Sequence, residues 1–256
     1  MSDQREFFRD VEREYWTEAE GLKAEEMALA ERYLDPTKST VDAGTGGGRV
    51  ARALAAAGYT RMSGFDFTPE LIEAARAADP EGSVDFTVAD ATDLPYPDAS
   101  FGQALYLQQV ISTIDDPAGR EGALAEAARI LAPSGTAIFS FVCLESRLSS
   151  PAQRTYVAYL RAARKLRHDT RPVQSMPRLR LSGRADASGA LRDRGPYNWW
   201  YRAEEIERDL THAGLSVEAI GFGAAAEAGT LSESAKEALV QGAGGTLYAV
   251  CRKLES

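Results

Sequence analysis

The sequence predicts an α/β protein built on a mainly parallel sheet. Between Val41 and Val142, short apolar runs alternate with amphipathic helical patterns, which is typical of successive strand–helix–strand units. A loop rich in glycine directly follows the first apolar run, and two more apolar runs lie near the C-terminal end. With 256 residues, of which 44% are hydrophobic, the chain is large enough to bury the core of one domain.

The elements follow one another in a regular order. The predicted strands are residues 39–44, 61–67, 84–91, 102–110, 135–143, 216–223 and 246–254. The predicted helices of the sheet are residues 49–58, 68–78, 115–131 and 202–215, with a short helical stretch at 232–240. Gly58 suits a helix C-terminus, and Thr68 with Pro69, like Asp116 with the following proline, suits a helix N-terminus.

Composition limits the classes of protein. A net charge of −9 argues against a general nucleic-acid or membrane binder. Cys143 and Cys251 each lie in an apolar run, which favours reduced core cysteines. The first residues are charged and contain no apolar core of a signal peptide, and no run approaches the length of a membrane span. We therefore expect a soluble cytoplasmic protein, either a monomer or a homodimer.

We expect a single domain, 1–256, in four parts. These are an N-terminal helical cap (1–35), a core (36–146), a lid insertion (147–196) and the end of the core (197–256). Residues 147–194 hold twelve Arg or Lys against three Asp or Glu, whereas residues 1–35 hold eleven acidic residues against five basic ones. The basic segment has three interpretations: it receives an anionic acceptor, it contacts RNA, or it pairs with the acidic N-terminal helices.

The glycine loop reads DAGTGGG, from Asp42 to Gly48. Backbone N–H groups at the start of a helix attract ligands, and glycine lets a ligand approach them closely. A plain tight turn requires only one or two glycines. Two ligand spacings fit the loop. A dinucleotide fingerprint can begin at Gly46 and end at Ala51, and a D-x-G-x-G-x-G pattern is satisfied in full by Asp42, Gly44, Gly46 and Gly48.

In the second spacing the sequence resembles the class I S-adenosylmethionine-dependent methyltransferases. Asp66 closes the second strand, where this family binds the ribose, and Asp90 with Ala91 stands where it binds the adenine. The stretch LPYPDASF after Asp90 and the two strands that close the chain are also similar to the family. The resemblance covers residues 41–142 well and 197–253 loosely.

The resemblance implies a Rossmann-like seven-stranded sheet of order 3-2-1-4-5-7-6, with helices on both faces and S-adenosyl-L-methionine as cofactor. The residues expected to contact the cofactor are Asp42, Gly44, Thr45, Gly46, Gly48, Asp66, Phe67, Asp90, Ala91, Gln108 and, from the N-terminal helix, Tyr15.

The acceptor side departs from the family. Many small-molecule members carry a histidine pair after the fourth strand, where this chain has Gln108 and Gln109. Glutamine orients an acceptor but cannot take its proton, so the catalytic residue stays open, with His168 as a weak candidate for a base. The residues expected to bind the acceptor are Trp16, Gln109, Tyr197 and Trp200. For Tyr197 and Trp200, a stacking wall and simple packing of the lid are equally weighted.

The sequence thus predicts methyl transfer to an oxygen or nitrogen atom of a small anionic or aromatic molecule, without a metal ion. Orientation and proximity would supply the rate. Three alternatives stay open: an RNA or protein methyltransferase, a cofactor-binding protein that performs no methylation, and an NAD oxidoreductase.

Overall fold

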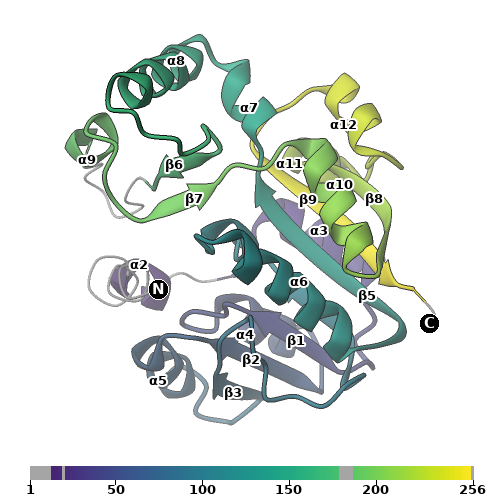
Figure 1. Cartoon of the computed structure of the whole chain (residues 1–256). Helices are drawn as coiled ribbons and strands as arrows, with labels where there is room; N and C mark the ends of the chain where they lie inside the picture. Colours follow the sequence, from purple (N-terminus) through teal and green to yellow (C-terminus); the bar gives the residue numbers. More distant parts are fainter. Residues whose placement is uncertain (1–12, 19–20, 179–186, 255–256) are drawn as a thin grey trace.

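A seven-stranded sheet forms the body of the protein. The computed structural model describes residues 13–18, 21–178 and 187–254. The strands of the sheet are β1 (Thr40–Ala43), β2 (Met62–Asp66), β3 (Val84–Val88), β4 (Phe101–Tyr106), β5 (Leu131–Val142), β8 (Leu215–Phe222) and β9 (Thr246–Lys253). Their order is β3-β2-β1-β4-β5-β9-β8 (Figure 1). Numbered among themselves, these seven strands have the expected order 3-2-1-4-5-7-6, because β6 and β7 belong to a separate hairpin.

The direction of the strands creates a crevice beside β1. The pairs β1–β2, β2–β3, β1–β4 and β4–β5 are parallel, whereas β9 runs antiparallel to both β5 and β8. After β1, the strands β2 and β3 are added on one side of β1, whereas β4 and the later strands of the sheet are added on its other side. At such a switch point the connections at the carboxyl ends of the two central strands diverge and leave room for a ligand.

Helices cover both faces and bury a separate apolar core on each. One core contains Val41, Tyr106 and Phe139 and is covered by α6 (Pro117–Ile130), α10 (Ala203–His212) and α12 (Ala235–Gln241). The other contains Leu105 and Tyr248 and is covered by α3 (Ala24–Tyr33), α4 (Arg49–Ala56), α5 (Pro69–Ala77) and α11 (Gly223–Ala228). Burial on both faces explains why the central strands are apolar almost without interruption.

The helix boundaries agree with the sequence signals. Asp116 is the N-cap of α6 and its carboxylate accepts from the Gly119 backbone N–H at 2.6 Å. Pro69 begins α5 directly after Thr68. Gly58, just beyond α4, has φ 99°, a conformation that favours glycine. The signals failed for α11, a short alanine-rich helix that the sequence analysis did not predict.

The segment between β5 and α10 forms a lid, and its two ends lie next to each other at the carboxyl end of β5. It consists of α7 (Leu144–Ser149), α8 (Pro151–Leu166), β6 (Ser175–Pro177), α9 (Ala187–Leu191) and β7 (Tyr197–Trp199), above the carboxyl end of β5 (Figure 1). The backbone N–H of Leu144 donates to the Tyr201 carbonyl at 2.8 Å, which closes the excursion. The lid therefore spans residues 144–200, slightly more than expected, and its β6–β7 hairpin was not predicted.

Two arginines of the lid form ion pairs with acidic residues of the lid itself. Arg164 forms a buried ion pair with Asp193 at 2.8 Å, and Arg171 pairs with Asp169 and Asp193. Within residues 13–18, 21–178 and 187–254, no recorded ion pair joins the lid to the N-terminal helices. Residues 1–12 and 19–20, which hold several of the acidic residues, lie outside the described part, so the interpretation that the two segments pair stays a prediction.

The N-terminal segment supplies two described helices that occupy different places. The helix α3 packs on one face of the sheet beside α11, and Tyr248 donates to Glu25 at 3.3 Å. The shorter α2 (Arg13–Glu18) lies instead against the glycine loop, where the Gly47 backbone N–H donates to the Trp16 carbonyl at 3.2 Å. In the described ranges, no helix has both the length and the apolar character that crossing a bilayer requires.

The Arg164–Asp193 pair is expected to hold the lid together. Arg164→Met leaves the Asp193 carboxylate buried without its bidentate partner, and such a loss costs about 3–5 kcal/mol. Urea unfolding should show this loss, and hydrogen exchange should show faster exchange in α8 and β7 than in the sheet. Arg161→Met, an exposed position on the same helix, is the matched control. Equal stability of the two variants would contradict this role.

Candidate active site

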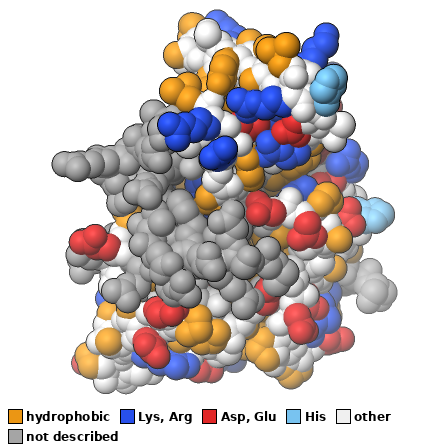
Figure 2. All heavy atoms as spheres, turned by 60° about the vertical axis from the view of Figure 1, so that its left-hand side comes forward, with side chains coloured by type: hydrophobic (Ala, Val, Ile, Leu, Met, Phe, Trp, Pro, Cys, Tyr) orange, Lys and Arg blue, Asp and Glu red, His pale blue; other side chains and the backbone are white. Residues whose placement is uncertain are grey.

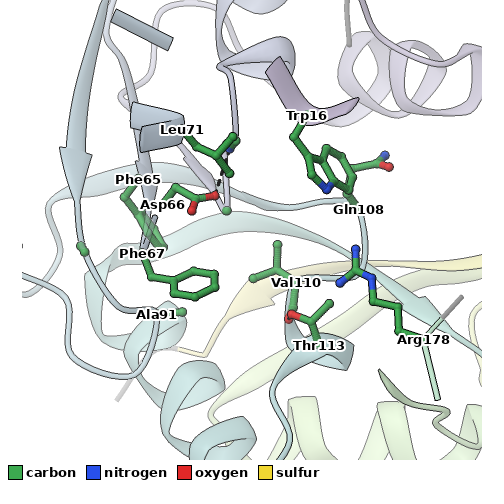
Figure 3. A pocket seen from close by; sticks show the side chains of 13 residues that line it. Trp16, Phe65, Asp66, Phe67, Leu71, Ala91, Gln108, Val110, Thr113 and Arg178 are labelled. Carbon is green, nitrogen blue, oxygen red and sulfur yellow. Dashed lines mark hydrogen bonds between the residues drawn. The ribbon is translucent and has the colours of Figure 1, made fainter. Parts of the chain in front are cut away.

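A cavity opens at the carboxyl ends of β1, β2 and β4, at the switch point of the sheet. About 530 Å³ of empty space, open solvent included, lies between its walls. Its walls come from the glycine loop, the ends of β2 and β3, the turn after β4, helix α2 and the lid (Figure 3). The lining residues are Trp16, Gly44, Gly46, Phe65, Asp66, Phe67, Leu71, Ala89, Ala91, Gln108, Val110, Thr113 and Arg178.

The glycine loop faces the cavity with bare backbone. Gly44, Gly46 and Gly48 have φ values of 60°, 56° and 80°, which favour glycine because a side chain would clash with the backbone. A Cβ atom on Gly44 would lie 2.6 Å from Cγ2 of Val110. Gly44 and Gly46 line the cavity as expected, whereas Gly48 caps α4 and packs against Phe86 on the side away from it.

Asp42 and Thr45 lie beneath the loop rather than in the cavity. The Thr45 hydroxyl donates to the Asp42 carboxylate at 2.7 Å, and both side chains are buried. Burial raises the pKa of Asp42 to about 7, although the hydrogen bond from Thr45 and the charge of Arg49 lower it. Neither residue is part of the cavity wall, so the structure gives them a supporting role in place of the expected contact with the cofactor.

The Asp66 carboxylate connects the glycine loop after β1 with the loop after β2 through hydrogen bonds. One carboxylate oxygen accepts from the Gly46 backbone N–H at 3.1 Å and the other accepts from that of Thr68 at 2.9 Å. Burial raises the pKa of Asp66, and these two donors oppose part of the rise. A carboxylate has lone pairs for further hydrogen bonds, and Asp66 lines the cavity beside Phe67 (Figure 3). Its position agrees with the expectation of a ribose contact, which stays a prediction.

Asp90 lines a shallow groove that continues from the cavity past Phe67. This groove is bounded by the end of β3 and the start of α5, and it shares Phe67 and Ala89 with the cavity. One oxygen of Asp90 accepts from the backbone N–H and the hydroxyl of Thr92, at 3.0 and 2.8 Å. Ala91 lines the cavity itself. The two residues expected at the adenine therefore lie at adjoining edges of one site.

The turn after β4 is the most strained backbone of the site. Gln108 and Gln109 have φ values of 57° and 62°, which are unusual for residues other than glycine. The sequence analysis instead predicted a strand through residue 110. The Gln108 amide donates to Glu26 and accepts from Lys23 at 3.2 Å, so this wall residue is held by α3 and the residue before it. Gln109 lies outside the cavity, with its amide directed to Thr246 on β9 at 3.3 Å.

The two aromatic residues of α2 differ in their relation to the cavity. Trp16 was expected at the acceptor, yet it lines the cavity beside the glycine loop and Gln108 (Figure 3). Tyr15 was expected at the cofactor, but it is exposed and contacts Trp16 edge to face, with ring centroids 5.0 Å apart. A Cβ atom on Gly47 would lie 2.6 Å from the Trp16 carbonyl oxygen, so Gly47 is required for this approach.

Tyr197, Trp200 and His168 lie away from the cavity wall. The Arg171 guanidinium stacks on the Tyr197 ring at 4.6 Å, and the Arg147 guanidinium stacks on the Trp200 ring at 4.3 Å. These contacts favour the packing role for both aromatic residues over a stacking wall for the acceptor. His168 is exposed in the turn after α8, with φ 54°, so the expectation that it acts as a base gains no support.

Sequence reasoning missed six wall residues: Phe65, Leu71, Ala89, Val110, Thr113 and Arg178. Val110 precedes the short 3-10 helix after β4, Ile111–Thr113, and Thr113 ends it, and this helix carries no motif. Arg178 follows β6 in the lid and brings a cation into the wall. The basic composition of the insertion was a signal for a cation here, but it did not indicate which arginine. In the described part of the chain, no group of three His, Cys, Asp or Glu residues could hold a metal ion.

Comparison with known proteins identifies the core of this fold. Residues 41–139, which contain the glycine loop, Asp66, Asp90 and the glutamine turn, match the family model of the methyltransferase domain. Residues 41–139 therefore form a methyltransferase domain of the S-adenosylmethionine-dependent family. A SAM-dependent methyltransferase from Methanosarcina mazei shares the fold, with a TM-score of 0.66 and 18% identity over 89% of this chain and 98% of that chain.

Curated relatives are similar over only part of the chain. An O-methyltransferase of Penicillium expansum, cnsE, is 31% identical over 104 residues, which are 39% of this chain and 36% of the relative. The 27-O-demethylrifamycin SV methyltransferase of Amycolatopsis mediterranei is 34% identical over 99 residues, which are 37% of this chain and 35% of the relative. The chain thus spans little more than a third of the length of these relatives.

The cofactor of this methyltransferase family is S-adenosylmethionine, and the observed site fits its parts. Gly44 and Gly46 present bare backbone to the cavity, where an amino-acid tail can approach closely. Asp66 offers carboxylate oxygens to hydroxyl groups, and the apolar side chain of Phe67 separates the cavity from the groove at Asp90. The Asp42 and Thr45 pair acts indirectly, because it holds the loop in this shape.

Asp66→Ala is expected to weaken the binding of S-adenosylhomocysteine by about 1.5–3 kcal/mol, because it removes hydrogen bonds to a charged group. Calorimetric titration measures the change. Asp85→Ala, an exposed position on β3, is the matched control and should bind as the wild type does. Unchanged affinity in Asp66→Ala would show that the ribose is placed elsewhere.

Asp42 is expected to make the protein less stable as the pH rises from about 4 to 7. Its folded pKa of about 7 exceeds the ordinary pKa of an aspartate in an unfolded chain, about 4, so the folded state binds more protons in this window. The free energy of unfolding therefore falls through the window. Asp42→Asn should be more stable than the wild type at pH 8, and the difference should shrink towards pH 4. Urea unfolding at these pH values checks this, with exposed Asp85→Asn as the control.

Proposed function

We propose that this protein transfers the methyl group of S-adenosylmethionine to an oxygen or nitrogen atom of a small molecule. The observation that carries the proposal is the cavity at the switch point, where the glycine loop, Asp66 and the end of β3 meet in a chain of this family. The cofactor supplies a sulfonium-bound methyl group that already has the driving force for transfer.

The role of the protein is to bind, to orient and to exclude water. Trp16 and the glutamine turn close one side of the cavity, and Phe67 and Ala91 line the opposite side (Figure 3). Holding an acceptor atom in line with the methyl group replaces a bimolecular encounter by an effectively unimolecular step. The lid, which lies above the carboxyl end of β5, would determine which acceptors enter.

Oxygen is the favoured acceptor atom. Both curated relatives reported above carry names that describe O-methylation, one of them on a rifamycin derivative. Their similarity covers less than two fifths of this chain, so it supports the type of transfer better than the identity of the acceptor. The proposal therefore names a small molecule with an oxygen acceptor and leaves the scaffold of that molecule to the experiment.

One observation favours a second candidate, a macromolecular acceptor such as RNA or protein. Lys and Arg side chains gather over the lid on the face shown in Figure 2, and α8 exposes Arg154, Arg161, Lys165 and Arg167. A basic surface can bind a polyanion. However, this patch is on one helix in a chain of net charge −9. An arginine-rich helix face that is simply exposed to solvent would look the same, so the patch supports the second candidate only weakly.

Titration with S-adenosylhomocysteine, and separately with NAD, is the test of the proposal. We expect micromolar binding of the first and none of the second. Conversion of S-adenosylmethionine to S-adenosylhomocysteine is then measured with panels of hydroxylated small molecules, with RNA and with protein extracts. Transfer to RNA or protein alone would support the second candidate. Binding of NAD alone, or cofactor binding without transfer to any acceptor, would contradict the proposal.

A further inference from the structure

The wall of the cavity holds one cation and no histidine, lysine, cysteine or tyrosine among the described residues. Its titratable side chains are Asp66, which accepts from two backbone N–H groups, and Arg178. Thr113 donates its hydroxyl proton to the Val110 carbonyl at 2.7 Å. A neutral alcohol that attacks a methyl group must lose a proton, and this wall offers no histidine base to receive it.

The amide of Gln108 is also committed elsewhere. It donates to the buried carboxylate of Glu26 and accepts from Lys23, both in or next to the N-terminal helix α3. It therefore shapes the wall and is not positioned to activate an acceptor. The position at which the family resemblance led us to look for a histidine pair is thus occupied by a side chain with a structural role.

Arg178 enters the cavity from the lid. Its backbone N–H donates to the Pro196 carbonyl at 2.8 Å, which extends the β6–β7 hairpin and fixes the start of the side chain. Figure 3 shows its guanidinium next to Val110 and Thr113, on the side of the cavity that faces Asp66 and Phe67. A guanidinium presents a planar fork of N–H donors that matches the oxygen atoms of an anion.

We propose that the acceptor is an organic oxyanion, a carboxylic acid or an acidic enol or phenol that is ionised at neutral pH, and that Arg178 is the residue that selects it. This inference rests on the proposed function and names the substrate class of the same site. The apolar side chains of Phe67, Leu71 and Val110 would hold the body of the acid, and the guanidinium would pair with its charged end.

Ionisation of the acceptor makes a protein base unnecessary. The attacking oxygen carries a lone pair and no proton. The new oxygen–carbon bond forms as the carbon–sulfur bond of S-adenosylmethionine breaks, and the electron pair of that bond stays on sulfur. The products are a neutral methyl ester or ether and the neutral thioether S-adenosylhomocysteine. The methylated product no longer pairs with Arg178 as an anion, which favours its release.

Binding of probe acids to the complex with S-adenosylhomocysteine tests the inference first. The probes are benzoate, cinnamate and 2,4-dinitrophenolate, each compared with its neutral counterpart benzamide, cinnamamide or phenol. In the wild type, at least one anion should bind ten or more times more tightly than its counterpart. Arg178→Gln should abolish this preference, Arg178→Lys should keep part of it, and Arg161→Gln, which removes an exposed charge from α8, should behave as the wild type.

The amino-acid carboxylate of the cofactor is the other anion that could reach this guanidinium. S-adenosylhomocysteine and 5′-methylthioadenosine, which lacks the amino-acid part, distinguish the two sources. If Arg178→Gln weakens the first ligand tenfold or more and leaves the second unchanged, Arg178 binds the cofactor and the proposal is overturned. Failure of all probe anions to bind, or an anion preference that survives in Arg178→Gln, overturns it as well.

Measurements of the rate of methyl transfer distinguish a failure of this inference from a failure of the proposed function. For an accepted acid, Arg178→Gln should raise KM at least tenfold and change kcat much less, and kcat/KM should follow the ionisation of each acid in a series. Arg178-dependent binding of acids without any methyl transfer would support the anion site and contradict the proposed function. Transfer to neutral hydroxyl compounds that does not depend on Arg178 would support the proposed function and overturn the anion site.

Discussion

The site depends on one buried carboxylate, that of Glu26. Its side chain accepts from both terminal nitrogens of Arg49 at 2.8 and 3.0 Å, from the Lys23 backbone N–H at 3.0 Å and from the Gln108 amide. These partners belong to the N-terminal segment, the first helix of the core and the strained turn after β4. A buried carboxylate is tolerated only with such complete pairing. The same contacts therefore fix the position of the turn that forms one wall of the cavity.

The sheet and the lid contribute different properties to the site. The sheet places the glycine loop, Asp66 and Ala91 at the carboxyl ends of neighbouring strands, and its two cores make this geometry rigid. The lid has a small apolar core of its own around Leu160 and Met176 and returns to the sheet at Tyr201. The residues proposed to bind the cofactor thus lie within residues 41–139, which match the family model, while Arg178 lies outside that match. Under the proposals above, such a division would let the acceptor change without altering the cofactor site.

The sequence predicted what depends on local patterns. Alternation of apolar runs and helices gave the fold class, and Asp116 and Pro69 marked helix starts because capping acts within a few residues. The glycine spacing identified Gly44 and Gly46, and strand ends identified Asp66 and Ala91. The sequence patterns did not predict contacts between segments that are distant along the chain.

Three contacts show the limit of local patterns. Nothing near Gln108 indicates a carboxylate 82 residues earlier in the chain. The sequence around Trp200 gives no sign of Arg147 stacked on its ring. Asp42 matched the family motif, but its side chain points beneath the loop, where Thr45 satisfies it. In each case the decisive partner is set by tertiary packing, which residue spacing alone does not reveal.

The glycine loop itself shows why a motif is more than a ligand cradle. Gly44 leaves room for Val110, Gly48 for Phe86, and Gly47 for the backbone of α2, with each Cβ position 2.6 to 2.7 Å from those atoms. The protein thus uses much of the bare backbone for its own packing. A side chain at position 47 would meet backbone, which cannot rotate away, so α2 and Trp16 would have to leave the loop. The glycine that brings Trp16 to the cavity is therefore part of the site, although it does not line it.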